Sequence, residues 1–211
     1  MGAVVLDMSM SLDGFVAGPG PRVGVPLGDG GQRLHDWMFS GRTDPGKALE
    51  GGQAADVNGA VARELFATTG AVLMGRRIFE LGIGPWADTP FPVPCFVLTH
   101  HAPEDLVMAS GTFTFVTEGL AAALDRARAA AGSRNVLAHS PDIAQQLLRA
   151  GLLDEIQLHL VPILLGEGLR LFEHTGEASR ELELTGMIEA PDVTHLYYRL
   201  AKQPAITSPA T

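Results

Sequence analysis

The chain has 211 residues, 46% of them hydrophobic, so it is long enough to bury a sizeable core as one domain. Its formal net charge of −9 argues against non-specific nucleic-acid binding, and no basic segment suggests a membrane surface. The single cysteine, Cys95, excludes an internal disulfide, and no apolar run reaches the length of a membrane span. These features predict a cytoplasmic protein without nucleic-acid or membrane partners.

The N-terminal region is predicted to form one strand followed by two long loops. The apolar run over residues 3–10 predicts a buried strand, and Asp13 with the glycine after it predicts a turn. Residues 18–33 and 41–56 are rich in glycine and proline, so we expect two loops with a short helix at 34–39 between them. Loops of this length in a compact domain commonly bind ligands or cover a site.

The middle of the chain is predicted to alternate strands with helices. One helix should follow the N-cap residue Asp56, and another should follow Thr117, which also has the side chain of an N-cap. A short strand at 135–139 runs directly into a helix that Ser140 caps and Pro141 opens. Further strands are expected at residues 71–75, 93–100 and 112–117.

The C-terminal third is predicted to contain strands only, at residues 155–166, 182–190 and 193–201. Strands that alternate with helices early and follow one another late predict an α/β sheet with an antiparallel end. We therefore expect a single domain, residues 1–201, followed by a disordered tail at 202–211.

Polar residues after two of the predicted strands mark a candidate ligand site. Arg76 and Arg77 come directly after a strand and Gly75, where a helix N-terminus and a guanidinium can share a phosphate. Thr99 and His100 end the next strand, and ligands of open α/β sheets bind at the carboxyl ends of strands. The alternative is that these are solvated surface residues. No spacing of histidines or cysteines predicts a metal site.

Residues near the long loops are further candidates. Asp13 lies beside a glycine turn, and its alternative is an ordinary turn residue. His35 and Asp36 precede Trp37, whose indole could wall a flat substrate or simply belong to the core. Gly166 lies in a tight turn that could be structural only. Ordinary surface or core positions are expected for His35, His159, His174 and His195.

Four segments, in order along the chain, resemble the dihydrofolate reductase-like family. They read "MSMSLDGF", "MGRRIFELG", "FVLTHHAP" and "AGLLDEIQLHLVPILLGEGLRLF". Their order and spacing are most similar to stand-alone relatives of the C-terminal reductase domain of the bifunctional riboflavin-biosynthesis protein. The resemblance covers residues 3–200, and the segment 151–172 is its most specific part.

The resemblance implies a central eight-stranded mixed sheet flanked by helices, a homodimer, and NADPH as hydride donor to a small conjugated heterocycle. The residues that it places near the cofactor are Ala17, Gly75, Arg76, Arg77, Thr99, His100, His139 and Ser140. Those proposed near the substrate are Phe15, Trp37 and Gly166, and the catalytic candidates are Asp13, His35 and Asp36.

Two departures from the family pattern bear on function. Leu34 stands where dihydrofolate reductases carry an acid, so dihydrofolate is not the expected substrate and the proton donor is not identified. Ala138-His139-Ser140 replaces glycines that let the backbone of relatives approach the pyrophosphate. The sequence therefore predicts an NADPH-dependent reductase. The alternative is a pseudo-reductase that has lost ordinary NADPH binding and uses its pocket for ligand binding or a cofactor-independent reaction.

Overall fold

A nine-stranded mixed sheet organises the chain in the computed structural model, which describes residues 1–39, 57–86, 88–101, 103–173, 175, 179–190 and 192–201. The strands, in sheet order, are β10 (Leu182–Ala190), β11 (Val193–Leu200), β8 (Glu155–Val161), β1 (Val4–Ser11), β7 (Asn135–Ala138), β3 (Thr69–Gly75), β4 (Cys95–Leu98), β6 (Thr112–Val116) and β5 (Leu106–Val107). The predicted Asp56 cap, the second glycine-rich loop and the C-terminal tail lie outside the described residues.

The dihydrofolate reductase-like architecture is confirmed, with one difference in the strand count. β1 pairs in parallel with both β7 and β8, whereas β11 and β10 pair antiparallel at one end of the sheet, as the late run of strands predicted. The ninth strand is the two-residue β5, which pairs antiparallel with β6 at the other end. Its two residues are too few to leave a periodic signal in the sequence.

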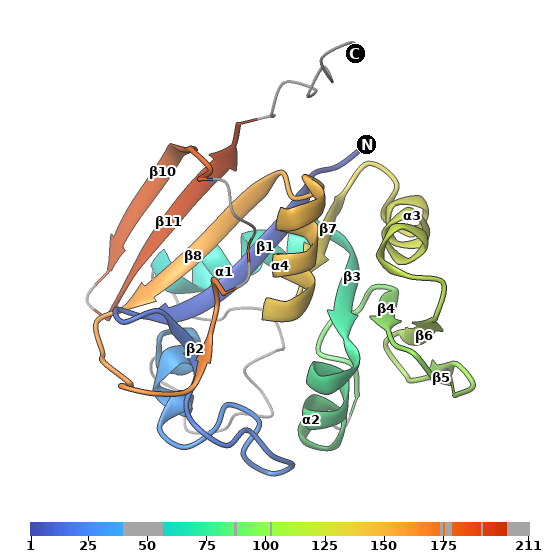
Figure 1. The fold of residues 1–211 in the computed structure, drawn as a ribbon, viewed down its shortest axis with the longest axis horizontal. Coiled ribbons are helices and arrows are strands. Elements are labelled where there is room, and N and C mark those ends of the chain that lie inside the picture. Colours follow the sequence, from blue (N-terminus) through green and yellow to red (C-terminus); the bar gives the residue numbers. More distant parts are fainter. Residues whose placement is uncertain are drawn as a thin grey trace, which may run out of the picture.

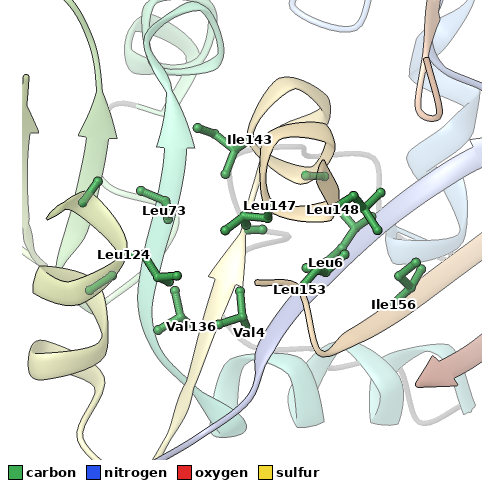
Figure 2. Close-up of a cluster of buried hydrophobic side chains, with 14 of the residues drawn as sticks. Val4, Leu6, Leu73, Leu124, Val136, Ile143, Leu147, Leu148, Leu153 and Ile156 are labelled. Atoms are coloured by element: carbon green, nitrogen blue, oxygen red, sulfur yellow. The ribbon is translucent and has the colours of Figure 1, made fainter. Parts of the chain in front are cut away.

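Within the described residues, five helices flank the sheet: η1 (Gly31–Phe39, a 3₁₀ helix), α1 (Val57–Thr68), α2 (Arg76–Trp86), α3 (Leu120–Ala131) and α4 (Pro141–Ala150). α3 and α4 cover one face, while α1 lies across the other (Figure 1). Figure 2 shows Ile143, Leu147 and Leu148 of α4 directed at the sheet, where they meet side chains of β1, β7 and β3. These three side chains form an apolar stripe on one face of α4 and hold the helix against the sheet.

Two helix starts test the capping predictions differently. Ser140 occupies the N-cap position of α4 and Pro141 is its first residue, as expected, but the Ser140 side chain makes no capping hydrogen bond to the helix. Gly151 ends the helix in the left-handed conformation with φ 67°. α3 begins at Leu120, with Gly119 as its N-cap at φ 96°, so the prediction that Thr117 caps this helix is wrong. Gly119 has a positive φ, which side chains such as that of threonine rarely adopt, so the helix begins after Gly119 and not directly after Thr117.

A small second sheet joins β2 (Phe15–Ala17) to β9 (Leu169–Arg170) beside the first glycine-rich loop. Gly168 has φ 138°, and a Cβ there would lie 2.1 Å from the carbonyl oxygen of Ala17. Only glycine permits this backbone approach, which fixes the turn before β9 against β2.

The described residues contain no helix long and apolar enough to cross a membrane. The outer strand, β10, leaves Leu182, Leu184 and Met187 exposed. An apolar edge strand of this kind favours pairing with another chain.

The homodimer stays a prediction, and β10 is where we expect it to form. Light scattering at micromolar concentration should give a mass of twice the chain. Met187→Lys should shift the protein toward the monomer, because it places a charge among the exposed apolar side chains. A monomeric wild type would contradict the prediction.

Replacement of Leu147, whose side chain on α4 is fully buried, should destabilise the fold. We expect Leu147→Ala to lower the free energy of unfolding by about 2–5 kcal/mol, through lost burial and a cavity. Urea denaturation measures this. Leu164→Ala, at a side chain that is 72% exposed, should change stability by less than about 0.5 kcal/mol.

Candidate functional site

A pocket of about 450 Å³ opens where β3, β4 and β6 end. It brings together four residues that the sequence placed at the cofactor, Arg76, Arg77, Thr99 and His100. The other lining residues are Leu98, His101, Thr117, Gly119, Leu120, Asp142 and Gln146. β3, β4 and β6 run parallel, so their carboxyl ends converge on this edge, as in other open α/β sheets.

The two arginines in the pocket differ in what they contact. The Arg76 guanidinium donates to the His101 carbonyl oxygen at 3.1 Å and lies 3.5 Å from the Thr99 hydroxyl, while its Nε lies 2.5 Å from Glu80. Arg77 is exposed and forms no hydrogen bond or ion pair with any other described residue. Both follow Gly75 at the start of α2, whose first N–H groups carry a partial positive charge. Arg77 and this helix terminus can therefore take up an anion together.

The start of α4 is built differently from a glycine-lined phosphate site. Ser140 is fully buried, and its hydroxyl accepts a hydrogen bond from the Gly75 N–H at 3.1 Å. With φ −171°, its backbone is extended and needs no glycine. Asp142 stands over Gly75, where a Cβ would lie 2.4 Å from a carboxylate oxygen. The junction thus joins α4 to β3 and adds a negative charge to the pocket.

His139 turns away from the pocket. Its N–H donates to the Leu73 carbonyl oxygen at 2.9 Å, and its ring packs against Phe91 with the ring centroids 4.9 Å apart. Burial lowers the pKa of His139 to about 4, against a weaker opposing effect of Asp7. The ring is therefore neutral near pH 7 and supplies no positive charge to a phosphate. Ala138, before it, is buried in β7.

The Asp13 side chain connects the turn after β1 to the segment at residues 165–166 through hydrogen bonds. Its carboxylate accepts hydrogen bonds from the Ser11 hydroxyl at 2.6 Å and from the N–H groups of Leu165 and Gly166 at 3.1 and 2.7 Å. The Ser11 hydrogen bond, the largest cause, lowers the pKa of Asp13 to about 2; burial opposes the shift, and the N–H bonds from Gly166 and Leu165 add to it. Asp13 is thus ionised at neutral pH, where it can orient a partner but has no proton to give.

The other predicted residues of this region are dispersed. Phe15 is buried beneath the Arg170 guanidinium, which lies 4.3 Å from its ring centroid, and Ala17 is buried in β2. Asp36 is exposed on η1. Trp37 is buried, and its indole N–H donates to the Ser9 hydroxyl at 2.9 Å.

A buried polar chain, absent from the sequence predictions, lies beside Trp37. His159 Nε2 lies 3.0 Å from an Asp7 carboxylate oxygen, and its Nδ1 lies 2.7 Å from Nδ1 of His195. His195 Nε2 lies 2.9 Å from the Asn58 side-chain oxygen. The hint in the sequence is that Asp7 and His159 lie within predicted strands that are partly buried. The strand partners that join them cannot be deduced from periodicity.

His35 completes this group on η1. It is half-buried, and its Nδ1 is shielded from solvent with no hydrogen-bond partner among the described residues. Burial, and then repulsion from His139 and His159, lower the pKa of His35 to about 4, while Asp7 opposes the shift. Within the described ranges, no group of His, Cys, Asp and Glu side chains is arranged to hold a metal ion.

Acid should destabilise the fold between pH 6.5 and 4, because the pKa values of His35, His139 and His195 fall from 6.5 to about 4 on folding. Their contribution is fully present above pH 6.5 and is lost as the pH falls toward 4, since the unfolded chain takes up protons first. The slope should reach about 1.4 kcal/mol per pH unit for each histidine. Urea denaturation across this range measures it. His35→Gln should lessen the slope and the exposed control His100→Gln should not; equal slopes in both would contradict the assignment.

Residues 3–196 match the RibD C-terminal domain family. The chain is 24% identical over 202 residues to uncharacterized protein YwjB of Bacillus subtilis, a match that covers 92% of this chain and 95% of that protein. A Shewanella protein assigned to riboflavin biosynthesis has a similar structure, with TM-score 0.67, 22% identity, and coverage of 94% of this chain and 99% of that one.

A second structure of this fold is the Thermotoga maritima diaminohydroxyphosphoribosylaminopyrimidine deaminase/5-amino-6-(5-phosphoribosylamino)uracil reductase. It matches with TM-score 0.61 and 11% identity, over 95% of this chain and 57% of the bifunctional one. Together with the sheet order and the match over residues 3–196, these similarities establish that the chain belongs to the RibD C-terminal domain family, a family of reductases with the dihydrofolate reductase-like fold.

Proposed function

We propose that the protein is an NADPH-dependent reductase of a small conjugated heterocycle of the pyrimidine or pterin type. The observation that carries the proposal is the pocket at the ends of β3, β4 and β6. It gathers Arg76, Arg77, Thr99 and His100 from separate segments of the chain onto one edge of the sheet. Membership of a reductase family supports the same conclusion.

The lining of the pocket fits the phosphate-bearing end of a dinucleotide. Arg77 and the N-terminus of α2 would hold a ribose phosphate. Arg76 lies beside them, and its side chain is held in place by Glu80 and by the His101 carbonyl oxygen. Thr99 and His100 would lie against the adenosine. Bound NADPH supplies a hydride, and the protein's part is to position the reactants, exclude water and provide a proton.

The substrate is proposed to lie toward β1 and η1. Asp13, Phe15, Trp37 and Gly166 remain the candidates to orient it, with Asp13 and Gly166 already joined by a hydrogen bond. Leu34, at the position of the acid in dihydrofolate reductases, is fully buried in an apolar cluster with Trp37. A buried leucine cannot bind the pterin ring of dihydrofolate through a charge, which supports a different heterocycle.

Calorimetric titration of the purified protein with NADPH tests the cofactor assignment. Loss of NADPH absorbance, with 5-amino-6-(5-phosphoribosylamino)uracil as probe substrate, tests the reaction class. Binding without turnover of the probe would retain the reductase and exclude this substrate. Absence of NADPH binding at millimolar concentration would refute the proposal.

Arg77→Ala should weaken binding of NADPH by tenfold or more and leave NADH affinity nearly unchanged, because a guanidinium–phosphate pair is a strong charge-assisted contact. Arg76→Ala should also favour NADH, with an added loss of order around Thr99 and His101. Arg199→Ala, in β11 outside the pocket, is the matched control. If Arg77→Ala weakens both dinucleotides equally, no 2′-phosphate lies at this position.

The second candidate is a pseudo-reductase that uses the pocket without a cofactor. Its support is the charge of Asp142, which lines the pocket where relatives would hold a pyrophosphate. A carboxylate near a phosphate repels it, so Asp142→Asn should tighten NADPH binding if the reductase proposal is right.

The junction itself can be probed with His139→Gly, which removes bulk without touching the Ser140–Gly75 bond. We expect NADPH affinity to change by less than threefold, because the His139 ring packs on Phe91 and is absent from the pocket lining. Ser140→Gly should instead lower the free energy of unfolding by about 1–3 kcal/mol, because it leaves the buried Gly75 N–H without its hydrogen-bond acceptor. A tenfold gain in affinity from His139→Gly would show that this side chain obstructs the cofactor.

A further inference from the structure

The pocket contains two unpaired charges of opposite sign. Arg77 and Asp142 are both exposed, and neither side chain forms a hydrogen bond or an ion pair with another described residue. Arg76, by contrast, is already paired, because its Nε lies 2.5 Å from the Glu80 carboxylate. Among the arginine and acidic side chains of the pocket, the charges left for a ligand are therefore one guanidinium and one carboxylate, which cancel.

The Asp142 carboxylate is fitted closely to the end of β3. Its two oxygens lie 2.4 and 2.9 Å from the point where a Cβ of residue 75 would be, and the three atoms nearest that point all belong to Asp142. Gly75 does not have a positive φ, so its backbone conformation alone would accept other residue types. Space for the carboxylate is therefore what requires glycine at this position.

The two charges act on the same small volume. Arg77 and Asp142 line one cavity of about 450 Å³. A cavity of this volume is about 8 Å across, which is no more than the Debye length of about 8–10 Å at 0.1–0.15 M salt. An anion anywhere in the pocket is therefore repelled by Asp142 as well as attracted by Arg77.

Two backbone donors at the junction before α4 are already used. The Gly75 N–H donates to the Ser140 hydroxyl, and the His139 N–H donates to the Leu73 carbonyl oxygen. Asp142 belongs to the first turn of α4 and places a carboxylate at that helix terminus. The pocket thus offers an anion its donors on the α2 side and a negative charge on the α4 side.

The remaining wall of the pocket suits a flat base. Leu98 and Leu120 give it an apolar portion, and a Cβ on Gly119 would meet no atom within 4 Å, so the wall is open there. The volume of about 450 Å³ lies in the lower part of the range of small-molecule sites. These features together fit a nucleoside with one phosphate.

We propose that the pocket is a site for a nucleoside with a single phosphate monoester, and that Asp142 is a specificity-determining residue that excludes compact di- and triphosphates. Arg77 offsets charge on one phosphate, whereas the charge of a second or third phosphate meets Asp142 with no other unpaired arginine in the pocket. The inference rests on the proposed function. Of the phosphates of NADPH, the 2′-phosphate is the monoester, so it is the one that the pocket accepts.

The carboxylate gives selectivity and lowers affinity at the same time. A pocket lined by one sign of charge concentrates every counter-ion, so a purely cationic pocket would also gather ATP and ADP. Asp142 removes this general attraction. It weakens the binding of NADPH as well, which agrees with the tighter NADPH binding expected of Asp142→Asn.

Calorimetric titrations of the whole protein with adenosine 2′-monophosphate and adenosine 5′-diphosphate test the proposal. We expect wild type to bind the monophosphate at least tenfold more tightly than the diphosphate. Asp142→Asn removes the charge and keeps the size of the side chain, so it should tighten the diphosphate more than the monophosphate and bring the two affinities within threefold. Equal affinities in wild type, or an unchanged ratio in Asp142→Asn, would overturn the proposal.

Asp192→Asn is the matched control for the change in net charge. Asp192 is an exposed aspartate in the turn between β10 and β11, at the end of the sheet away from the pocket. We expect this variant to bind both ligands as wild type does. A loss of discrimination in Asp192→Asn equal to that in Asp142→Asn would show an effect of overall charge and refute the role of Asp142.

Two further variants locate the effect. Asp142→Ala should admit the diphosphate as Asp142→Asn does; if only the alanine variant admits it, the exclusion is by bulk and the charge assignment is wrong. Arg77→Ala should weaken binding of the monophosphate by tenfold or more. Unchanged binding would place the monophosphate outside this pocket and overturn the inference.

The outcome with NADPH separates this inference from the proposed function. If wild type binds the monophosphate, discriminates against the diphosphate and fails to bind NADPH, the single-phosphate site stands and the reductase fails. If NADPH binds while the two adenosine phosphates bind equally, the reductase stands and Asp142 has no selective role. Absence of monophosphate binding at millimolar concentration would refute the single-phosphate site.

Discussion

The parallel pairing of β1 between β7 and β8 is the constraint on which the remainder of the structure depends. A strand with parallel neighbours on both sides is covered on both faces, and its alternate residues are divided between two environments. Leu6 enters the apolar core under α4, whereas Asp7 and Ser9 face the side of η1 and α1. The parallel order continues from β7 through β3, β4 and β6, whose carboxyl ends lie at one edge, where the pocket opens. The position of β1 therefore contributes both to the apolar core and to the buried polar chain.

The pocket and the polar chain hold charge in different ways. In the pocket, solvent reaches both Arg77 and Asp142, so the attraction and repulsion felt by an anion are screened. In the polar chain, His159 and His195 are removed from water, and each must be matched by a neighbouring donor or acceptor. The first arrangement suits reversible binding of a soluble anion. The second suits a group whose protonation is set by the fold.

Local sequence signals anticipated the architecture and the pocket, and they missed what depends on distant partners. Arg76, Thr99 and the strands before them could be placed together because strand ends converge in any sheet of this class. Ser140 was identified as a helix cap, but its bond to Gly75 joins residues 65 positions apart. The contact of Asp7 with His159 spans 152 positions and depends on which strands are neighbours. Hydrophobic periodicity tells which face a residue takes, not which strand lies beside it.

The close approach of Asp142 to Gly75 also has an evolutionary consequence. A Cβ at position 75 would lie 2.4 Å from a carboxylate oxygen of Asp142, so the two positions restrict each other. A descendant that acquires a larger residue at 75 requires the Asp142 side chain to turn away or to be replaced by a smaller one. Loss of the aspartate would remove a negative charge from the pocket. A change selected for packing would thus alter the affinity of the pocket for anions, without any change in a ligand-contacting arginine.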